Sequence, residues 1–241
     1  FFREDVAVAN LRKIRDENIS DGIDRDIWQK AVELGFAGIL IPEEYGGTEF
    51  GMTGMGLVMQ EAGRCLAATP LLSSSILSAS LILLTGNDTQ KQSLLPDMAS
   101  GQLLITLALE ETGHHNPVMT SLPATRKANN LEISGHKTFV QDGHIADKLI
   151  VVIRTSGQAG DTDGLTLCLV DAKAQGIKIE RTGMVDSRNA AEISFDKVTV
   201  SADDILGELD AGHQPLEAAL DMGRIALSAE ILGGVEEVFE R

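Results

Sequence analysis

The hydrophobic positions in the first part of the chain follow a helical period. Apolar residues recur every third or fourth position, which predicts helices at about residues 2–14, 25–34, 53–65, 71–84 and 88–100. Asp24, Thr53 and Asp88 stand where N-caps are expected, and Gly35 stands where the second helix should stop. Segment 71–84 is apolar on nearly all sides, so we expect it to be a buried central helix.

The pattern changes at Leu103 to short apolar runs separated by Gly, Asn and Asp, which are typical of β-strands. We expect strands at residues 103–109, 122–128, 131–133, 137–140, 148–154, 165–170, 177–181 and 192–200. A helical period returns from Gln214 onward. The predicted fold class is therefore α+β, with a helical domain at 1–102, an antiparallel β domain at 103–206 and a helical segment at 207–241.

Composition and charge exclude several classes of function. The chain of 241 residues has a formal net charge of -16, which argues against nucleic acid and anionic membrane surfaces as partners. No apolar run approaches the roughly 20 residues of a membrane span. The two isolated cysteines predict neither a disulfide framework nor a metal site, and they favour a reducing compartment. No signal peptide is recognisable, and the last helical pattern reaches Arg241 without a cap, so we expect a processed chain or a fragment.

Two groups of charged residues are candidates for chemistry. Glu110 and Glu111 close an apolar strand, which is compatible with a ligand role or with a solvated turn. Arg224 stands among apolar and small residues of the last helix, where a cation needs a partner. That partner is either Asp221 on the same helix face or an anionic ligand. The adjacent pair His114 and His115 lacks metal-site spacing, so a loop role is favoured and no metal is predicted.

Several motifs, in this order and spacing, resemble the acyl-CoA dehydrogenase family over essentially the whole chain. They are Leu34-Gly35-Phe36-Ala37-Gly38, Pro42-Glu43-Glu44-Tyr45-Gly46-Gly47, Ala108-Leu109-Glu110-Glu111, Gly135-His136-Lys137-Thr138-Phe139-Val140, Ala146-Asp147, Ala191-Glu192-Ile193-Ser194-Phe195-Asp196-Lys197-Val198 and Gly223-Arg224. The resemblance implies a C-terminal helical bundle, of which residues 207–241 are the opening helix.

The resemblance also implies an activity and its partners. The expected reaction is the FAD-dependent α,β-dehydrogenation of an acyl-CoA thioester, in which a glutamate removes the α proton and the flavin accepts the β hydride. The electrons would pass to an electron-transfer flavoprotein. A homo- or hetero-oligomer would form through the bundle. The bacterial cytoplasm is the expected compartment, with the mitochondrial matrix as the alternative.

The site residues that the resemblance implies fall in two sets. The flavin would be lined by Ala108, Leu109, Phe139, Val140 and Gln141. The CoA ester would be faced by His115, Asp221 and Arg224.

The chain departs from the family pattern at this site. Leu109 and Gln141 replace two threonines that contact the flavin in the family. The usual base lies in the bundle beyond Arg241, and the position used by a variant group is Gly223, so the catalytic base is unknown. These losses favour an alternative, a non-catalytic subunit that binds acyl-CoA or a catalytic partner chain. A third interpretation is a helical interaction module without a cofactor.

Overall fold

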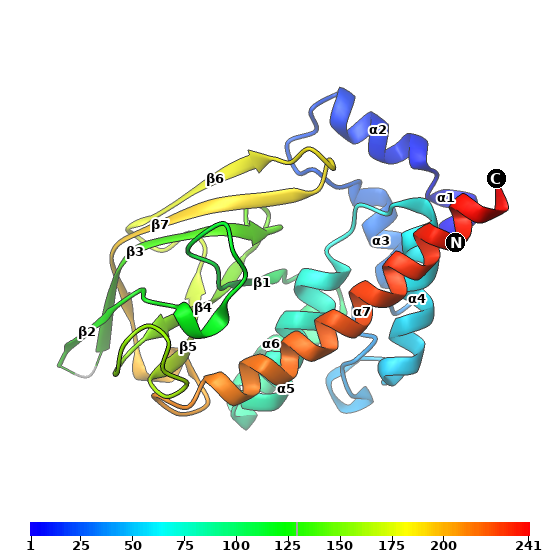
Figure 1. Ribbon diagram of the computed structural model, residues 1–241. Coiled ribbons are helices and arrows are strands. Elements are labelled where there is room, and N and C mark those ends of the chain that lie inside the picture. The colour runs from blue at the N-terminus through cyan, green and yellow to red at the C-terminus, as the bar shows by residue number, and fades with distance from the viewer. Residues whose placement is uncertain (129) are drawn as a thin grey trace.

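The computed structural model describes residues 1–128 and 130–241, which form a helical region beside a β-sandwich (Figure 1). The first half supplies the helices α1 (Phe2–Asp5), α2 (Val8–Asp16), α3 (Arg25–Glu33), α4 (Gly51–Cys65), the π-helical segment η2 (Leu71–Ser78), α5 (Ala79–Thr85) and α6 (Asp88–Ala99). Short 3-10 turns are η1 (Glu43–Tyr45), η3 (Pro117–Met119) and η4 (Ala202–Asp204). The predicted α+β class is confirmed.

The helix ends show which predicted caps form. The Asp24 carboxylate accepts hydrogen bonds from the amides of Asp26 and Ile27 at 3.0 and 3.2 Å, so this cap is confirmed. Gly35 follows α3 with φ +81°, a left-handed conformation that glycine adopts without strain.

Two predicted caps were wrong. α6 is capped by Asn87, whose side chain accepts from the amide of Gln90 at 2.9 Å, and Asp88 is the first helical residue. Thr53 lies inside α4, which begins at Gly51. Both predicted caps lie within two residues of the first residue of the helix, and sequence alone does not locate a helix terminus more accurately than this.

The predicted buried helix is present, but its first half is π-helical. Segment η2 carries four buried serines, Ser73, Ser74, Ser75 and Ser78. Ser74 Oγ accepts from the amide of Ile105 at 3.3 Å, and Ser78 Oγ donates to the carbonyl of Ser73 at 2.8 Å. These bonds satisfy hydroxyl groups that burial would otherwise penalise.

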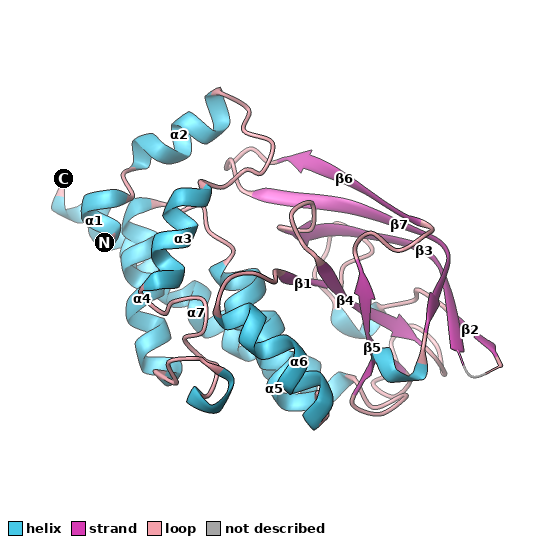
Figure 2. Cartoon of the chain, turned by 180° about the vertical axis from the view of Figure 1, so that it is seen from behind, coloured by secondary structure: helices cyan, strands magenta, loops and turns pink. Residues whose placement is uncertain are grey.

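The β domain contains two four-stranded sheets that face each other (Figures 1 and 2). The first has the order β1 (Ile105–Ala108), β4 (Lys148–Arg154), β5 (Leu165–Asp171) and β8 (Ile205–Leu206). The second has the order β2 (Ala124–Lys127), β3 (Asn130–Gln141), β7 (Asn189–Val200) and β6 (Ile177–Gly183). All pairings between these strands are antiparallel except β1 with β4, which is parallel. β3 joins two runs that were predicted as separate strands, and β8 was not predicted.

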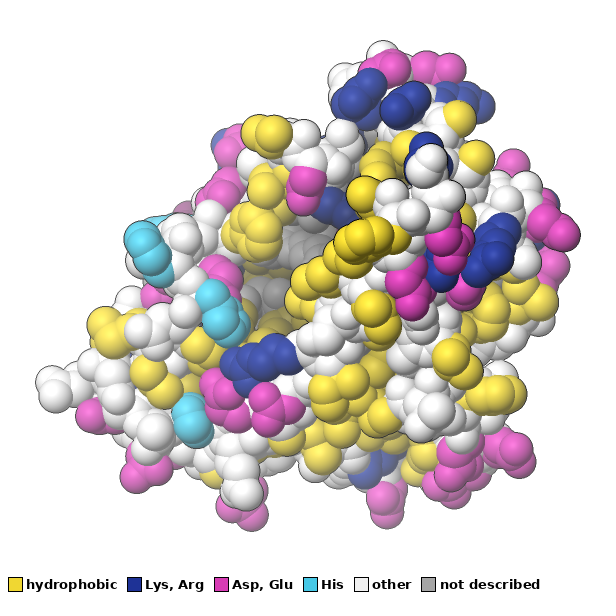
Figure 3. Space-filling model, turned by 45° about the vertical axis from the view of Figure 1, so that its right-hand side comes forward, with side chains coloured by type: hydrophobic (Ala, Val, Ile, Leu, Met, Phe, Trp, Pro, Cys, Tyr) yellow, Lys and Arg dark blue, Asp and Glu magenta, His cyan; other side chains and the backbone are white. Residues whose placement is uncertain are grey.

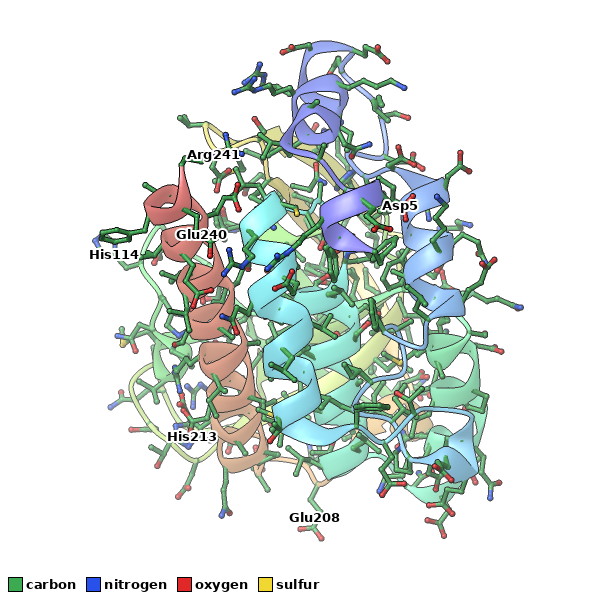
Figure 4. The ribbon with its side chains drawn as sticks, turned by 90° about the vertical axis from the view of Figure 1, so that its right-hand side faces the viewer. Asp5, His114, Glu208, His213, Glu240 and Arg241 are labelled. Carbon is green, nitrogen blue, oxygen red and sulfur yellow. The ribbon has the colours of Figure 1, made fainter. Side chains whose placement is uncertain are left out.

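The helix α7 (His213–Glu240) connects the β-sandwich with the helical region. Its N-terminal part packs on η2 and α5, and its C-terminal part, which ends at Glu240, lies beside α4 (Figure 4). The two helices approach closely at Gly63 and Gly233, where an added Cβ would lie 1.9 and 1.8 Å from a backbone oxygen of the other helix. At the far end, the guanidinium of Arg64 on α4 pairs with Glu236 at 2.6 Å and with Glu240 at 3.0 Å. Within the described residues, no helix has the length and apolarity needed to cross a membrane.

Candidate functional site

A cavity of about 300 Å³ opens where η2, β1, β3 and α7 meet. We call it the leucine cavity. Its lining residues are Leu72, Ser73, Leu77, Thr106, Leu107, Leu109, Glu110, His115, Phe139, Gln141, Leu220, Gly223, Arg224 and Leu227. Gly223 helps to keep it open, because a Cβ there would lie 2.6 Å from Leu77 Cδ2.

A second cavity of about 410 Å³ shares Leu72, Phe139, Gln141 and Leu227 with the first. We call it the Arg188 cavity. It is bordered by an ion pair between Arg188, on the loop between β6 and β7, and Glu230 on α7. On this side of the molecule the surface is hollowed between hydrophobic side chains, with basic, acidic and histidine side chains along the edge (Figure 3).

Phe139 lies between the two cavities because β3 is irregular there. Its pairing with β7 shifts register between Lys137 and Val140, and Phe139 has φ +52°. An irregularity of this kind re-aims a side chain, so that it no longer follows the regular alternation between the two faces of the sheet. The Phe139 side chain consequently stays 55% exposed and borders both cavities.

Three of the five predicted flavin residues meet at the leucine cavity. They are Leu109 at the end of β1, Phe139, and Gln141, whose carbonyl accepts from Thr106 Oγ at 2.6 Å. Ala108 and Val140 are instead fully buried among the residues between the two sheets. Adjacent strand residues point to opposite faces, so a cavity contact by Ala108 or Val140 is restricted to the backbone.

The rim of the leucine cavity is polar. His115 Nδ1 lies 2.6 Å from Glu110 Oε1, and both residues line the cavity. Arg224 lines it as well, while its guanidinium donates to Asp221 at 2.5 Å and to Glu217 at 3.2 Å. Arg224 is therefore paired within its helix and still 47% exposed at the cavity. Asp221, which was predicted to face the CoA ester, is not among the residues that line the cavity. It contacts Arg224, which does line it.

His114 and His115 are adjacent in sequence but border different cavities. His115 borders the leucine cavity, whereas His114 borders a separate cavity of about 470 Å³ beside the loop after β1. In the described parts of the chain, no group of three or more His, Cys, Asp and Glu side chains is arranged to hold a metal ion.

Two buried charged residues next to the cavity were missed by the sequence analysis. Lys137 is completely buried, and its Nζ donates to the carbonyl of Leu109 at 2.9 Å and to Glu111 Oε1 at 2.7 Å. Burial lowers the pKa of Lys137 to about 8. Asp142 is also buried and accepts a hydrogen bond from Ser73 Oγ at 2.6 Å. Burial raises the pKa of Asp142 to about 6.

A sequence signal for these two residues existed. Lys137 opens the predicted strand 137–140 and Asp142 follows it by two residues, and charged side chains so close to apolar strand residues need partners if they are buried. The partners Glu111 and Ser73 are distant in sequence, so the pattern could not identify them.

Comparison with known proteins places this site in a family. The N-terminal domain of acyl-CoA dehydrogenase matches residues 1–102, and the middle domain of acyl-CoA dehydrogenase matches residues 107–198. The 3-(aryl)acrylate reductase of Clostridium sporogenes is 32% identical, over 95% of this chain and 62% of that protein. The mitochondrial isovaleryl-CoA dehydrogenase of Pongo abelii is also 32% identical, over 90% of this chain and 53% of that protein.

A solved structure, the acyl-CoA dehydrogenase from Geobacillus kaustophilus, is similar in fold. It superposes with a TM-score of 0.87 at 25% identity, covering 99% of this chain and 64% of that one. The chain thus spans less than two thirds of the length of these relatives. From its matched domains and its fold, the chain belongs to the acyl-CoA dehydrogenase family.

Proposed function

We propose that this chain forms the flavin-facing and acyl-binding part of an enzyme that dehydrogenates an acyl-CoA thioester between its α and β carbons. The observation that carries the proposal is the leucine cavity, an apolar cavity with a polar rim that lies directly beside an exposed aromatic ring. An acyl chain needs such an apolar cavity, and a thioester needs polar groups at its mouth.

The residues at Phe139 fit FAD, the cofactor of the family. A half-exposed aromatic ring between two cavities is a surface on which a flat ring system can pack. Leu109 and Gln141 would hold the flavin beside Phe139, and the carboxamide of Gln141 can donate and accept hydrogen bonds. When bound, FAD supplies the acceptor for the hydride that leaves the β carbon.

The cavity residues have separate tasks in this proposal. Leu77, Leu107 and Leu220 exclude water from the acyl chain, so that polar contacts at the rim are strengthened. Arg224 and His115 face the thioester and the start of the CoA group. Asp221 orients the guanidinium of Arg224 through their hydrogen bond.

Removal of the α proton is assigned to no residue of this chain. Gly223 has no side chain, and a larger residue at this position would meet Leu77. General-base catalysis contributes about two to four orders of magnitude. We therefore expect the 241 residues alone to have no acyl-CoA dehydrogenase turnover comparable to that of an ordinary dehydrogenase. Such turnover, measured on the purified chain, would contradict this assignment.

The organisation and partners belong to the same proposal. Residues 1–102, 103–206 and 207–241 would be the helical domain, the β domain and the opening helix of a bundle that forms homo- or hetero-oligomers. An electron-transfer flavoprotein would accept the electrons. The bacterial cytoplasm is the proposed compartment and the mitochondrial matrix the alternative, because relatives include both bacterial and mitochondrial proteins.

The second candidate is a subunit that binds acyl-CoA or a partner chain without catalysing the reaction. It is favoured by Leu109, which replaces a hydroxyl expected at the flavin, and by Gly223. The two candidates predict different fates for a bound acyl-CoA.

The test uses protein expressed from the complete reading frame and reconstituted with FAD. A dehydrogenase subunit binds FAD, and its flavin absorbance is bleached when acyl-CoA is added without oxygen. A non-catalytic subunit binds acyl-CoA and leaves the flavin oxidised. A protein that binds neither FAD nor acyl-CoA contradicts both candidates and favours an interaction module.

A further inference from the structure

A buried cation lies directly beneath the backbone that borders the leucine cavity. Lys137 is on β3, two residues before Phe139, and its side chain has no exposed surface. Its Nζ donates to the carbonyl of Leu109, the first residue after β1. One side chain thus connects the strand that carries Phe139 with the end of the strand that carries Leu109.

The carboxylate of Glu111, which balances the charge of Lys137, is held by several hydrogen bonds. Glu111 Oε1 lies 2.7 Å from Lys137 Nζ and accepts the amide of Leu122 at 2.9 Å. Its other carboxylate oxygen accepts the amide and the hydroxyl of Ser121 at 2.9 and 2.6 Å. The loop between β1 and β2, which carries Glu110 and His115, is therefore anchored to β3 by a buried ion pair.

The bond to the Leu109 carbonyl fixes the orientation of one peptide group. In a trans peptide the carbonyl and the following N–H point in opposite directions. With the Leu109 carbonyl directed at Lys137, the N–H of Glu110 is directed away from it. Glu110 borders the leucine cavity, and within the described residues its N–H has no protein acceptor. The carbonyl of Glu110 is fixed too, because it accepts from the amide of Thr138 at 2.8 Å.

We propose that Lys137 is a positioning residue for FAD: it holds the peptide between Leu109 and Glu110 so that the Glu110 N–H is free to donate to the flavin. This inference rests on the proposed function. It also explains how Leu109 is tolerated where the family resemblance implies a hydroxyl. The backbone donor remains, and the buried ammonium group polarises its peptide in a region of low dielectric.

Three variants of the protein from the complete reading frame separate positioning from stability. Lys137→Met removes the ammonium group but keeps most of the side-chain volume, and it leaves Glu111 as an unpaired buried carboxylate. The double variant Lys137→Met/Glu111→Gln removes both charges, which is close to neutral for the stability of a buried pair. The matched control is Lys178→Met, which makes the same change at an exposed lysine of β6 in the same sheet.

Each variant is measured for melting temperature without FAD, for FAD dissociation constant and for the absorption bands of bound FAD. We expect Lys137→Met to lose both stability and FAD affinity, and Lys178→Met to lose neither. The double variant should regain most of the melting temperature, yet bind FAD about ten-fold or more weakly, the size of one lost hydrogen bond to a charged group. Its flavin bands should also be shifted from those of the wild type.

The outcomes separate this inference from the proposed function. If the double variant binds FAD as tightly as the wild type with unchanged absorption bands, Lys137 is only structural and the inference is wrong. If the wild-type protein itself binds no FAD, the proposed function is wrong, and the inference that rests on it is wrong as well.

Discussion

At the residue scale, Asp142 is an unusual group, because it is a carboxylic acid that is buried in the folded chain. It is buried just after β3, and Ser73 Oγ donates a hydrogen bond to its carboxylate at 2.6 Å. Its pKa is raised from 3.8 to about 6, mainly by burial. An acid whose pKa is raised on folding destabilises the folded state as the pH rises through this interval.

Replacing Asp142 by Asn should therefore stabilise the protein at alkaline pH. The amide keeps an acceptor for Ser73 and is never charged. At pH 8 the free energy of unfolding should rise by about 2–3 kcal/mol, and the gain should vanish below about pH 4. Urea unfolding across this range measures it. The control Asp196→Asn, at an exposed position of β7, should change little at any pH. A gain independent of pH would show that ionisation of Asp142 is not its cause.

Arg224 gives a residue-scale prediction for the acyl-CoA ligand. It lines the leucine cavity while paired with Asp221 and Glu217. In the protein from the complete reading frame, Arg224→Ala should weaken acyl-CoA binding by at least ~1.5 kcal/mol, the low end for a hydrogen bond to a charged group, and leave FAD content unchanged. Calorimetric titration and flavin absorbance measure the two effects.

The control for Arg224 is Arg25→Ala on α3. Arg25, the first residue of α3, also forms an ion pair with a residue four positions away, Asp21 at 2.7 Å, and its side chain is 52% exposed. Arg25 borders none of the described cavities, so its replacement should not affect acyl-CoA binding. If Arg224→Ala lowers the melting temperature but leaves the affinity for acyl-CoA unaltered, Arg224 stabilises the fold through its ion pairs and does not bind the ligand.

At this scale the family resemblance, rather than local pattern, selected the candidate site residues, and their roles stay predictions. Leu109, Phe139, His115 and Arg224 come from four segments, and all four border one cavity. Lys137 was not found, because its importance depends on the carbonyl of Leu109 and on Glu111, which only the folded chain brings together.

At the element scale, α4 and α7 cross at close range. Gly63 and Gly233 let the two backbones approach without side chains between them. Next to the crossing, the side-chain Nε2 of Gln60 donates to Glu236 Oε2 at 2.7 Å, and Arg64 pairs with the same carboxylate at 2.6 Å. The position of α7 over the cavities thus depends on two glycines and one cluster of charges.

Gly63→Ala should displace α7 from α4. The new Cβ would lie 1.9 Å from the carbonyl oxygen of Glu230, and neither backbone can yield locally. We expect a loss of about 1–3 kcal/mol in the free energy of unfolding, as for other overpacked sites. Hydrogen exchange should show faster exchange along α7.

Gly56→Ala is the matched control, because it lies on the same helix and an added Cβ there meets nothing within 4 Å. This control should stabilise α4 slightly, since alanine favours helix more than glycine does. Equal exchange along α7 in the Gly63→Ala variant and the wild type would show that the crossing tolerates a methyl group.

The elements show what local periodicity can and cannot predict. The Asp24 cap and the extent of β4 follow from neighbouring residues and were predicted closely. The π-helical form of η2 and the parallel pairing of β1 with β4 were not predicted. Both depend on tertiary contacts, such as the bond between Ser74 and Ile105 that fixes η2 against β1.

At the scale of the whole molecule, α7 exposes an apolar surface. Its inner side is buried, but the outer side presents a row of large hydrophobic residues that we call the outer stripe. It consists of Ile225, Leu232, Val235, Val238 and Phe239. Contiguous apolar surface of this kind favours association.

The 241-residue chain should therefore self-associate through the outer stripe. Sedimentation velocity should show a mass that rises with protein concentration. Val235→Lys/Val238→Lys should abolish this rise, because two charges would have to be buried in the contact. Val185→Lys, at an isolated and fully exposed valine, should not. A monomeric wild-type chain at every concentration would contradict a role of the stripe in association.

The position of α7 in the chain order also determines when the leucine cavity exists. Leu72, Leu107 and Phe139 are synthesised before α7, which supplies Leu220, Gly223 and Leu227. Until α7 docks across the two glycines, the cavity is an open apolar surface on a nascent chain. Its completion is consequently a late event in biogenesis. During that interval the exposed apolar residues of the unfinished site are prone to aggregation.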